Sequence, residues 1–385
     1  MSGNAGFIFS EDFLKYRFND EHPFNQKRVL LAKDLLETND TLQVQDIIPP
    51  RMATDEELAL FHDYDFIHAV KRGGKGLLSE DEGYEYGLGT EDTPIFTNMH
   101  EASSYLVGGT LTAVDEVLSG NRDHALNLGG GLHHGFQRKA AGFCIYNDSA
   151  VAIKYIRKKY DLKVLYVDTD AHHGDGVQWA FYDDPNVCTF SIHETGRYLF
   201  PGTGNVNERG IKHGHGYSFN LPIDAFTQDE SFLHVYETAF KEIAEFFKPD
   251  IIVTQNGADA HCFDPLTHLC GSMRIFDQIP LVAHEMAHQY CNGKWIATGG
   301  GGYDMWRVVP RAWAQIWNVM KTGEPAKGSI PKEWITKWQI DSPVDLPLFW
   351  HDNSEVLPDI PRKAEITEKN DKLLQSLLKY TKTIK

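Results

Sequence analysis

The chain has 385 residues, 42% of them hydrophobic and 24% charged, which is enough to bury the core of one large domain. Its net charge of −17 argues against a protein that coats nucleic acid or an anionic membrane. Its five cysteines form no Cys-x-x-Cys pair, the first residues lack a secretory pattern, and no apolar run reaches the roughly 18–20 residues that span a bilayer. We expect a soluble cytoplasmic protein that binds neither nucleic acid nor membrane.

Short apolar segments alternate with helical patterns along most of the chain. We predict strands at 7–9, 125–128, 164–167, 187–192, 251–254 and 295–298. We predict helices at 26–37, 55–72, 101–118, 148–159, 229–247, 276–290 and 308–321, with Asp148 as the N-cap of the fourth. Residues 73–93 are rich in Gly, Asp and Glu and should form a long loop.

This alternation predicts an α/β fold with a central, mostly parallel β-sheet covered by helices on both faces. We assign residues 1–322 to a single catalytic domain. Residues 323–385 lose the alternation, and we expect a C-terminal extension, packed on the catalytic domain or peripheral to it, with one helix near 372–380.

Five of the predicted strands end in clusters that are rich in glycine or charge. The clusters are 129–135, 168–176, 193–194, 255–259 and 299–303. Ligands of open α/β sheets bind outside the carboxyl ends of the strands. We therefore expect these clusters to meet at one site.

The cluster Asp-Thr-Asp-Ala-His-His-Gly-Asp-Gly at 168–176 predicts a metal centre. Side chains alternate along an extended chain, so Asp168, Asp170 and His172 should share a face. Burying them unpaired would cost several kcal/mol each, whereas a metal ion would satisfy them. A catalytic zinc takes three protein ligands, and Asp259 is the natural third beside Asp170 and His172.

Two further clusters supply groups for chemistry on a carbonyl. Tyr303, behind four glycines, can donate a hydrogen bond to a developing oxyanion. His133 and His134, also behind a glycine run, can act as general base and general acid. We expect Asp168 and Asp175 each to orient one of these histidines and to raise its pKa.

A zinc-protease motif, His-Glu-x-x-His, is formally present at 284–288. The extended spacing of such proteases would place a third histidine at position 294, which is Lys294. We interpret the motif as chance spacing on a half-exposed helix.

Taken together, the motifs at 168–176, Gly-Gly-Gly-Leu-His-His at 129–134, Gly-Ala-Asp at 257–259 and Gly-Gly-Gly-Gly-Tyr at 299–303 resemble the zinc-dependent histone deacetylase family, within the arginase–deacetylase fold. The resemblance covers roughly residues 5–320. The sequences of segments 87–96 and 264–269 most resemble those of the bacterial family members that take part in acetoin utilization.

The resemblance implies zinc, or ferrous iron, on Asp170, His172 and Asp259. It implies that His133 pairs with Asp168 and that His134 pairs with Asp175. His134 would then be the proton shuttle and His133 mainly an electrostatic group. Tyr303 would bind the acetyl oxygen.

The resemblance also implies the surroundings of this centre. A substrate tunnel and rim would be formed by Asp92, Gly142, Phe143, Phe200, Leu266 and Gly301. A structural K⁺ or Na⁺ site would use Asp168, Asp170, His172, Ser191 and Ile192, and a second would use Phe181, Asp184, Val187 and Tyr217. Arg28 resembles an arginine beside an acetate exit channel.

The expected activity is hydrolysis of Nε-acetyl-lysine in proteins. Acetylated metabolic enzymes, acyl-CoA synthetases in particular, are the substrates that the bacterial resemblance suggests. A polyamine or small-amide deacetylase and a non-catalytic binder of acetylated partners are the alternatives. An arginase-like binuclear site would need Asp-Ala-His-x-Asp, but position 174 is Gly174.

Overall fold

The computed structural model describes residues 3–353 and 357–381. Residues 1–2 of the predicted catalytic domain, and 354–356 and 382–385 of the predicted extension, lie outside the described residues. One sheet has the strand order β2-β1-β3-β8-β7-β4-β5-β6. Its strands are β1 (Ala5–Ile8), β2 (Ile47–Ile48), β3 (His124–Asn127), β4 (Val164–Asp168), β5 (Val187–Glu194), β6 (Ser218–Ile223), β7 (Ile251–Gln255) and β8 (Trp295–Thr298).

All neighbouring strands pair in parallel. The predicted α/β fold is therefore confirmed, with a sheet that is parallel throughout. Parallel strands need crossover connections, and helices in those connections cover both faces of the sheet.

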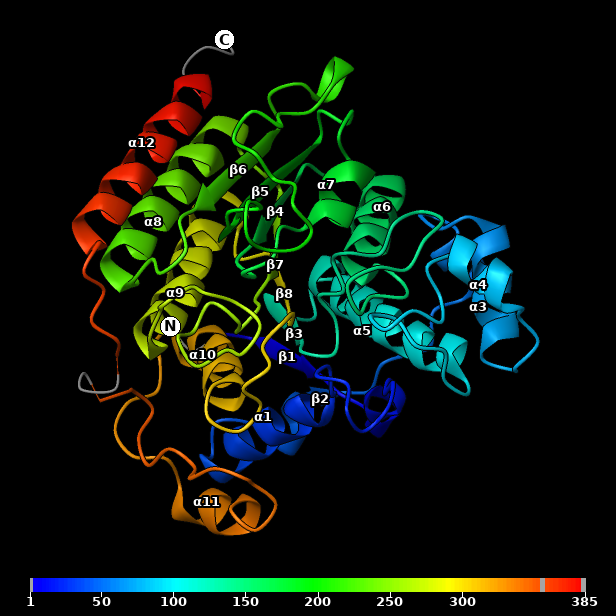
Figure 1. Cartoon of the computed structure of the whole chain (residues 1–385), viewed down its shortest axis with the longest axis horizontal. Coiled ribbons are helices and arrows are strands. Elements are labelled where there is room, and N and C mark those ends of the chain that lie inside the picture. The colour runs from blue at the N-terminus through cyan, green and yellow to red at the C-terminus, as the bar shows by residue number, and fades with distance from the viewer. Residues whose placement is uncertain (1–2, 354–356, 382–385) are drawn as a thin grey trace.

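Helices cover the two faces of the sheet (Figure 1), and a hydrophobic core lies on each face. Leu165 and Val167 of β4 belong to one core, and Val164 and Tyr166 belong to the other, because successive side chains of a strand point to opposite faces. The first core also contains residues of α1 (Lys27–Thr38), α8 (Asp229–Phe247), α9 (Met273–Tyr290), α10 (Val309–Thr322) and α12 (Lys363–Thr381). The second contains residues of α3 (Tyr64–Gly73), α5 (Met99–Leu118), α6 (Asp148–Tyr160) and α7 (Asp175–Ala180).

Several helix boundaries differ from the predictions. The helix predicted at 55–72 is two helices, α2 (Asp55–Leu58) and α3, with the buried His62 between them. The loop predicted at 73–93 contains α4 (Glu80–Glu85), whose N-cap Ser79 accepts a hydrogen bond from the Glu82 N–H. Asp148 was wrongly predicted to cap α6. The N-cap is Asn147, which accepts a hydrogen bond from the Ala150 N–H.

Both edge strands escaped prediction. β6 reads Ser-Phe-Asn-Leu-Pro-Ile, and its proline is typical of an edge, where an N–H need not be donated. β2 has only two residues and precedes two prolines. Short strands that contain or adjoin proline lack the apolar run that marks a central strand of a parallel sheet.

The chain after residue 322 packs against the rest of the molecule through its two helices. The helix predicted at 372–380 is α12, which begins at Lys363 and packs along α8 and β6 (Figure 1). A second helix, α11 (Lys332–Trp338), contacts α1. In the segment between these two helices, the Asp352 carboxylate binds Arg311 at 2.8 Å and His261 at 2.9 Å. The division at residues 322 and 323 stays a prediction.

Candidate active site

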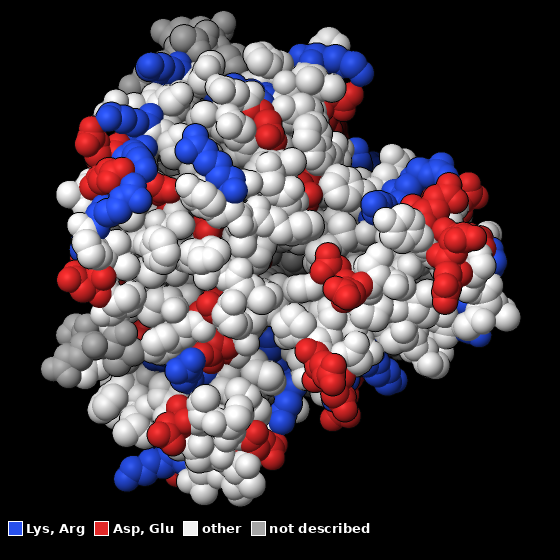
Figure 2. All heavy atoms as spheres, in the orientation of Figure 1, with Lys and Arg blue, Asp and Glu red and all other residues white. Residues whose placement is uncertain are grey.

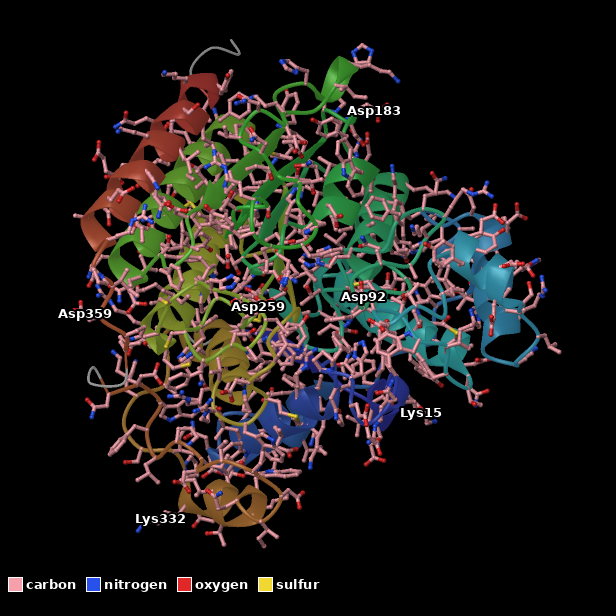
Figure 3. All side chains as sticks on the ribbon, in the orientation of Figure 1. Lys15, Asp92, Asp183, Asp259, Lys332 and Asp359 are labelled. Carbon is pink, nitrogen blue, oxygen red and sulfur yellow. The ribbon has the colours of Figure 1, made fainter. Side chains whose placement is uncertain are left out.

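The five clusters predicted to meet follow β3, β4, β5, β7 and β8. These strands are consecutive in the sheet, in the order β3-β8-β7-β4-β5. Their carboxyl ends therefore lie along one edge. Figure 2 shows a hollow near the centre of one face of the molecule, and Figure 3 labels Asp259 and Asp92 in the same central region.

The predicted metal ligands come together at this edge. Asp170 follows β4 by two residues, His172 by four, and Asp259 lies four residues beyond β7. His172 Nδ1 lies 3.1 Å from Asp170 Oδ1 and 3.0 Å from Asp259 Oδ2. One ligand atom from each of the three lies within 4.8 Å of the other two.

The second oxygen of each carboxylate is held by the protein. Asp170 Oδ2 accepts hydrogen bonds from the Gly301 N–H and the Gln255 side-chain amide, each at 2.7 Å. Asp259 Oδ1 accepts one from the Ala171 N–H at 2.8 Å. The remaining oxygens are thereby directed toward His172, as outer hydrogen bonds direct ligands in metal sites.

These three side chains fit a divalent cation. Both carboxylates are fully buried, and two like charges held this close need a positive charge between them. Burial lowers the pKa of His172, but the hydrogen bonds and charges of Asp170 and Asp259 outweigh it and raise that pKa well above its usual value. Two carboxylate oxygens and one imidazole nitrogen form an ordinary donor set for zinc or ferrous iron.

Two buried histidine–aspartate pairs lie next to this centre. His133 Nδ1 donates to Asp168 Oδ2 at 2.7 Å, and His134 Nδ1 donates to Asp175 Oδ1 at 2.7 Å. A carboxylate only accepts, so Nδ1 carries the proton in each ring and Nε2 is left for the site.

The environments of the two histidines drive their pKa values apart. Burial lowers the pKa of His133, but the charges of Asp168 and Asp170 prevail and raise it to about 9. Burial and the neighbouring His133 lower the pKa of His134 to about 4, against the opposing effect of Asp175. The prediction that the paired aspartate raises the histidine pKa is therefore confirmed for His133 and wrong for His134. A cationic His133 beside a neutral His134 separates an electrostatic group from a proton acceptor.

Tyr303 lines the same cavity. Burial, together with the charges of Asp259 and Asp170, raises its pKa well above 10, so its hydroxyl keeps its proton and can donate. The Tyr303 N–H donates to Asp264 Oδ2 at 2.8 Å, which fixes the backbone of the glycine-rich segment before it.

All six predicted tunnel and rim residues line one cavity of about 240 Å³: Asp92, Gly142, Phe143, Phe200, Leu266 and Gly301. His133, His134, Asp170, His172 and Tyr303 line it as well. The Phe143 ring lies 5.8 Å from that of Tyr303, and the Phe200 ring lies 5.0 Å from that of His134, between centroids. Two phenyl rings therefore flank the approach to the polar floor of the cavity.

Gly142 has a φ of +50°, in the left-handed region. A Cβ there would lie 2.5 Å from His134 Cδ2 and 2.9 Å from the Phe200 ring. The absence of a side chain lets the backbone of Gly142 pack directly against the rings of His134 and Phe200 in the cavity wall.

Several residues of the site escaped sequence reasoning. Phe24 and Leu199 line the cavity, and neither belongs to a predicted cluster. The Tyr166 hydroxyl donates to Asp168 Oδ2 at 2.7 Å, although its position in an apolar strand suggested only core packing. Asp148 accepts from the Gly131 and Leu132 N–H groups and so anchors the loop before His133. Its position after Asn147 suggested only a helix cap.

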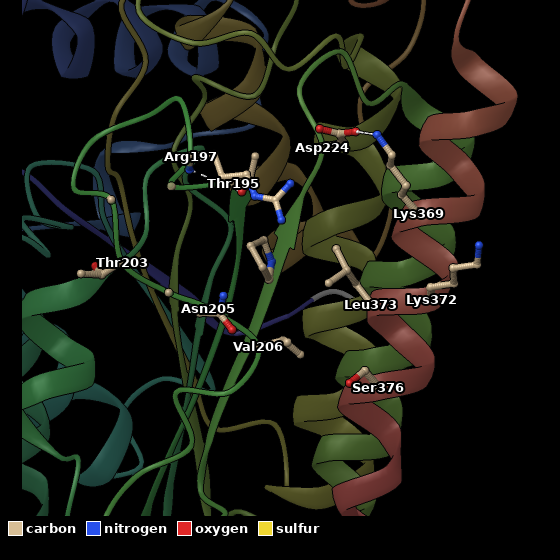
Figure 4. A pocket seen from close by; sticks show the side chains of 14 residues that line it. Thr195, Arg197, Thr203, Asn205, Val206, Asp224, Lys369, Lys372, Leu373 and Ser376 are labelled. Atoms are coloured by element: carbon tan, nitrogen blue, oxygen red, sulfur yellow. Dashed lines mark hydrogen bonds and ion pairs between the residues drawn. The ribbon is translucent and has the colours of Figure 1, made fainter.

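A second, larger cavity of about 520 Å³ lies between residues 195–206 and α12 (Figure 4). Its ionisable lining groups are Arg197, Asp224, Lys369 and Lys372, and Asp224 is paired with Lys369 at 2.9 Å. The loop that carries Phe200 thus separates this cavity from the candidate active site.

A family model described as "Histone deacetylase domain" matches residues 22–320. The chain belongs to the histone deacetylase family. Acetoin utilization protein AcuC of Bacillus subtilis (strain 168) is 62% identical over 372 residues, which cover 97% of this chain and 96% of that protein. AcuC of Staphylococcus xylosus is 45% identical, with 99% of both chains covered.

Solved structures agree with this assignment. The crystal structure of an HDAC homolog from Aquifex aeolicus matches with a TM-score of 0.83 at 30% identity, over 95% of this chain and 99% of that one. An HDAC homolog complexed with SAHA matches with a TM-score of 0.83 at 31% identity, over 96% and 100%. Histone deacetylase family enzymes are metal-dependent hydrolases, and the three-ligand cluster described above suits that chemistry.

The residues of the predicted monovalent-cation sites also lie close together. For the first site, Asp168 is the register partner of Ser191, and the Asp170 N–H donates to Asp168 Oδ1. For the second, the Asp184 N–H donates to the Phe181 carbonyl and the Val187 N–H to the Asp184 carbonyl, while the Tyr217 carbonyl accepts from Thr189. Their use as cation ligands stays a prediction.

Arg28 lies behind the metal ligands. It is buried, it donates to the Gly302 carbonyl at 2.7 Å, and its guanidinium lies over the rings of Phe24 and Trp313. Burial lowers its pKa, and interactions with the Tyr303 phenol and with the carboxylates of Asp259 and Asp170 oppose that shift. Its predicted role beside an exit channel remains a prediction.

Proposed function

We propose that this protein hydrolyses the amide bond of Nε-acetyl-lysine in proteins and releases acetate, with zinc or ferrous iron held by Asp170, His172 and Asp259. One observation carries the proposal. A single narrow cavity joins a buried metal-ligand set, two histidine–aspartate pairs and a protonated phenol to an approach flanked by Phe143 and Phe200. Aromatic walls suit the apolar stem of an acetylated lysine.

The bound ion would supply Lewis acidity to the acetyl carbonyl and to water in the site. His134, neutral and held through Nδ1, accepts the proton that water loses as it attacks. Tyr303 donates a hydrogen bond to the carbonyl oxygen, which becomes negative in the transition state. His133 adds positive charge beside the same centre. The proton on His134 then passes to the departing lysine amine, so that water and amide become acetate and amine.

The 62% identical relative is named for acetoin utilization, which points to metabolism, and we propose acetylated metabolic enzymes, acyl-CoA synthetases in particular, rather than histones as the substrates. We further propose a K⁺ or Na⁺ ion at each predicted monovalent site. All five cysteines are free, which suits the reducing cytoplasm as the place of action. No described helix has the length and apolar character needed to cross a membrane.

The direct test is the turnover of an acetyl-lysine peptide by zinc-reconstituted protein, measured as free acetate, beside an acetylated polyamine. Asp92 is exposed at the cavity mouth, where it can accept hydrogen bonds from the substrate backbone. Hydrogen bonds to charged groups contribute about 1.5–3 kcal/mol. Asp92→Ala should therefore lower kcat/KM for the peptide roughly 10–100-fold and leave the acetylated polyamine unaffected.

Glu91→Ala is the matched control, because Glu91 is the exposed neighbour and does not line the cavity. Turnover of the polyamine alone would replace the proposal by a small-amide deacetylase. Turnover of neither substrate by the metal-loaded protein would leave a binding role for acetylated partners.

A further inference from the structure

The His-Glu-x-x-His motif of α9 lies next to a third histidine, which comes from a distant part of the chain. His284 and His288 are one helical turn apart and share a face. His124, the first residue of β3, lies against them, with its ring centroid 5.0 Å from that of His284 and 5.2 Å from that of His288. Some 160 residues separate this histidine from the motif along the chain.

The nitrogen atoms of these three rings converge. His284 Nε2 and His288 Nε2 lie 3.1 Å apart and share a hydrogen bond, and one nitrogen from each ring lies within 4.8 Å of the other two. Two nitrogens bound at about 2.0–2.1 Å to a tetrahedral zinc ion lie about 3.3 Å apart. The two helical histidines are thus already spaced as a pair of zinc ligands.

The environment of His124 indicates that a metal ion is its missing partner. Its ring is fully buried, and neither ring nitrogen has a hydrogen-bond partner among the described residues. The backbone of Asp123 and Gly293 lies next to the ring without forming a hydrogen bond of normal geometry. A buried imidazole without a partner costs free energy that an ion at the convergence point would recover.

The remaining surroundings suit a transition-metal ion. The Trp295 ring packs against His124 and His284 and walls the cluster on the protein side, while His288 is exposed. Three imidazoles with one open side match the donor set that zinc, copper and nickel accept.

We propose that His124, His284 and His288 form a second metal site, which binds one zinc-class divalent ion with its fourth position open to solvent. The site lies at the amino-terminal end of the strands, whereas the candidate active site lies at the carboxyl-terminal end. Its ion links α9 to the start of β3.

The arrangement does not make a protease. Glu285, which would have to act as the base, forms an ion pair with Lys241 of α8 at 3.0 Å and is 53% exposed.

Zinc binding measures the site directly. Metal-free full-length protein is titrated with zinc against a chromophoric chelator, for the wild type and for His284→Ala and His288→Ala. We expect each variant to bind one zinc equivalent fewer than the wild type. The zinc affinity that remains at this site should be at least 10–100-fold lower than in the wild type. Mutating a residue that only hydrogen-bonds to a metal ligand already costs that much, so losing a ligand should cost no less. Acetyl-lysine turnover should stay unchanged.

His68→Ala is the control, because His68 is an exposed histidine on another helix, α3. It should bind as much zinc as the wild type. A second measurement uses amide hydrogen exchange, which zinc should slow at 284–288 and at 124 in the wild type and in His68→Ala only. The difference of one equivalent does not depend on how well the active site is loaded. Equal zinc stoichiometry and affinity in wild type, His284→Ala and His288→Ala would overturn the proposal.

Discussion

The hydroxyl of Tyr303 offers the sharpest test of the proposed chemistry. Tyr303→Phe removes one oxygen and leaves the ring, its edge-to-face contact with Phe143 at 5.8 Å and the backbone bond to Asp264 in place. Because burial and the charges of Asp259 and Asp170 hold the phenol protonated, the loss is that of a single neutral hydrogen-bond donor.

The size of the effect follows from where that donor acts. A hydrogen bond that is made equally in the ground state and the transition state would change KM and leave kcat unaltered. A donor aimed at the developing oxyanion acts on kcat, and removing one costs about 2.7–4 kcal/mol, or roughly 10²–10³ in rate. We therefore expect kcat to fall by that factor, while KM and zinc content stay within about threefold of the wild type.

The assay is steady-state release of acetate from an acetyl-lysine peptide, with zinc content and thermal stability measured on the same preparations. Tyr84→Phe provides the control, because Tyr84 is 77% exposed and should behave as the wild type. A fall in kcat of less than threefold would remove Tyr303 from the chemistry. A matching loss of zinc would assign the effect to the metal centre instead.

Three further predictions concern the metal, the passage and the pH dependence of stability. Asp259→Ala should lose zinc and deacetylase activity together, and full activity without the metal would refute the mechanism. Gly142→Ala places a Cβ 2.5 Å from the His134 ring at a φ of +50°. We expect it to cost about 1–3 kcal/mol of stability and most of the activity, and wild-type turnover would contradict the close approach. Burial lowers the pKa of His62 to about 3, and its Nε2 accepts from the Asn147 N–H at 2.9 Å. The unfolded chain therefore binds a proton that the folded chain does not, so this contribution is present above about pH 6.5 and is lost on acidification toward pH 3, by up to about 1.4 kcal/mol per pH unit. In His62→Gln the unfolding free energy should vary less steeply with pH across this window, and an unchanged slope would exclude His62 as the source.

The sequence alone predicted the central strands and the residues that follow them. β4 is an apolar run because it is buried on both faces, and the same burial makes the carboxylates after it conspicuous. Asp170 and His172 lie two residues apart at the end of one strand. Because side chains alternate between the two faces of an extended chain, the sequence alone predicts that these two lie close together. Asp259 required one further rule, that parallel strands end at the same edge.

Long-range packing set the limits of that reasoning. Phe24 reaches the cavity from a loop near the amino terminus, and β6 joins the sheet at an edge where proline weakens the strand pattern. The pKa of His134 also departed from expectation, because its value reflects burial and His133 as much as its partner Asp175. Each of these features depends on burial in the fold or on residues that are distant in the sequence, so the local sequence could not predict it.

The sequence by itself determined the α/β class and indicated which carboxylate, imidazole and phenol side chains we propose as metal ligands and acid–base groups, because their spacing within short segments expresses their chemistry. Only the tertiary structure decided that Phe24 and Leu199 also line the cavity, how α12 and Asp352 attach the last segment to the rest of the chain, and that His124 contacts the histidine pair on α9. Those contacts join residues far apart in the chain. Their free energy comes from burial and hydrogen bonding in a folded interior, which no local pattern of residue types records.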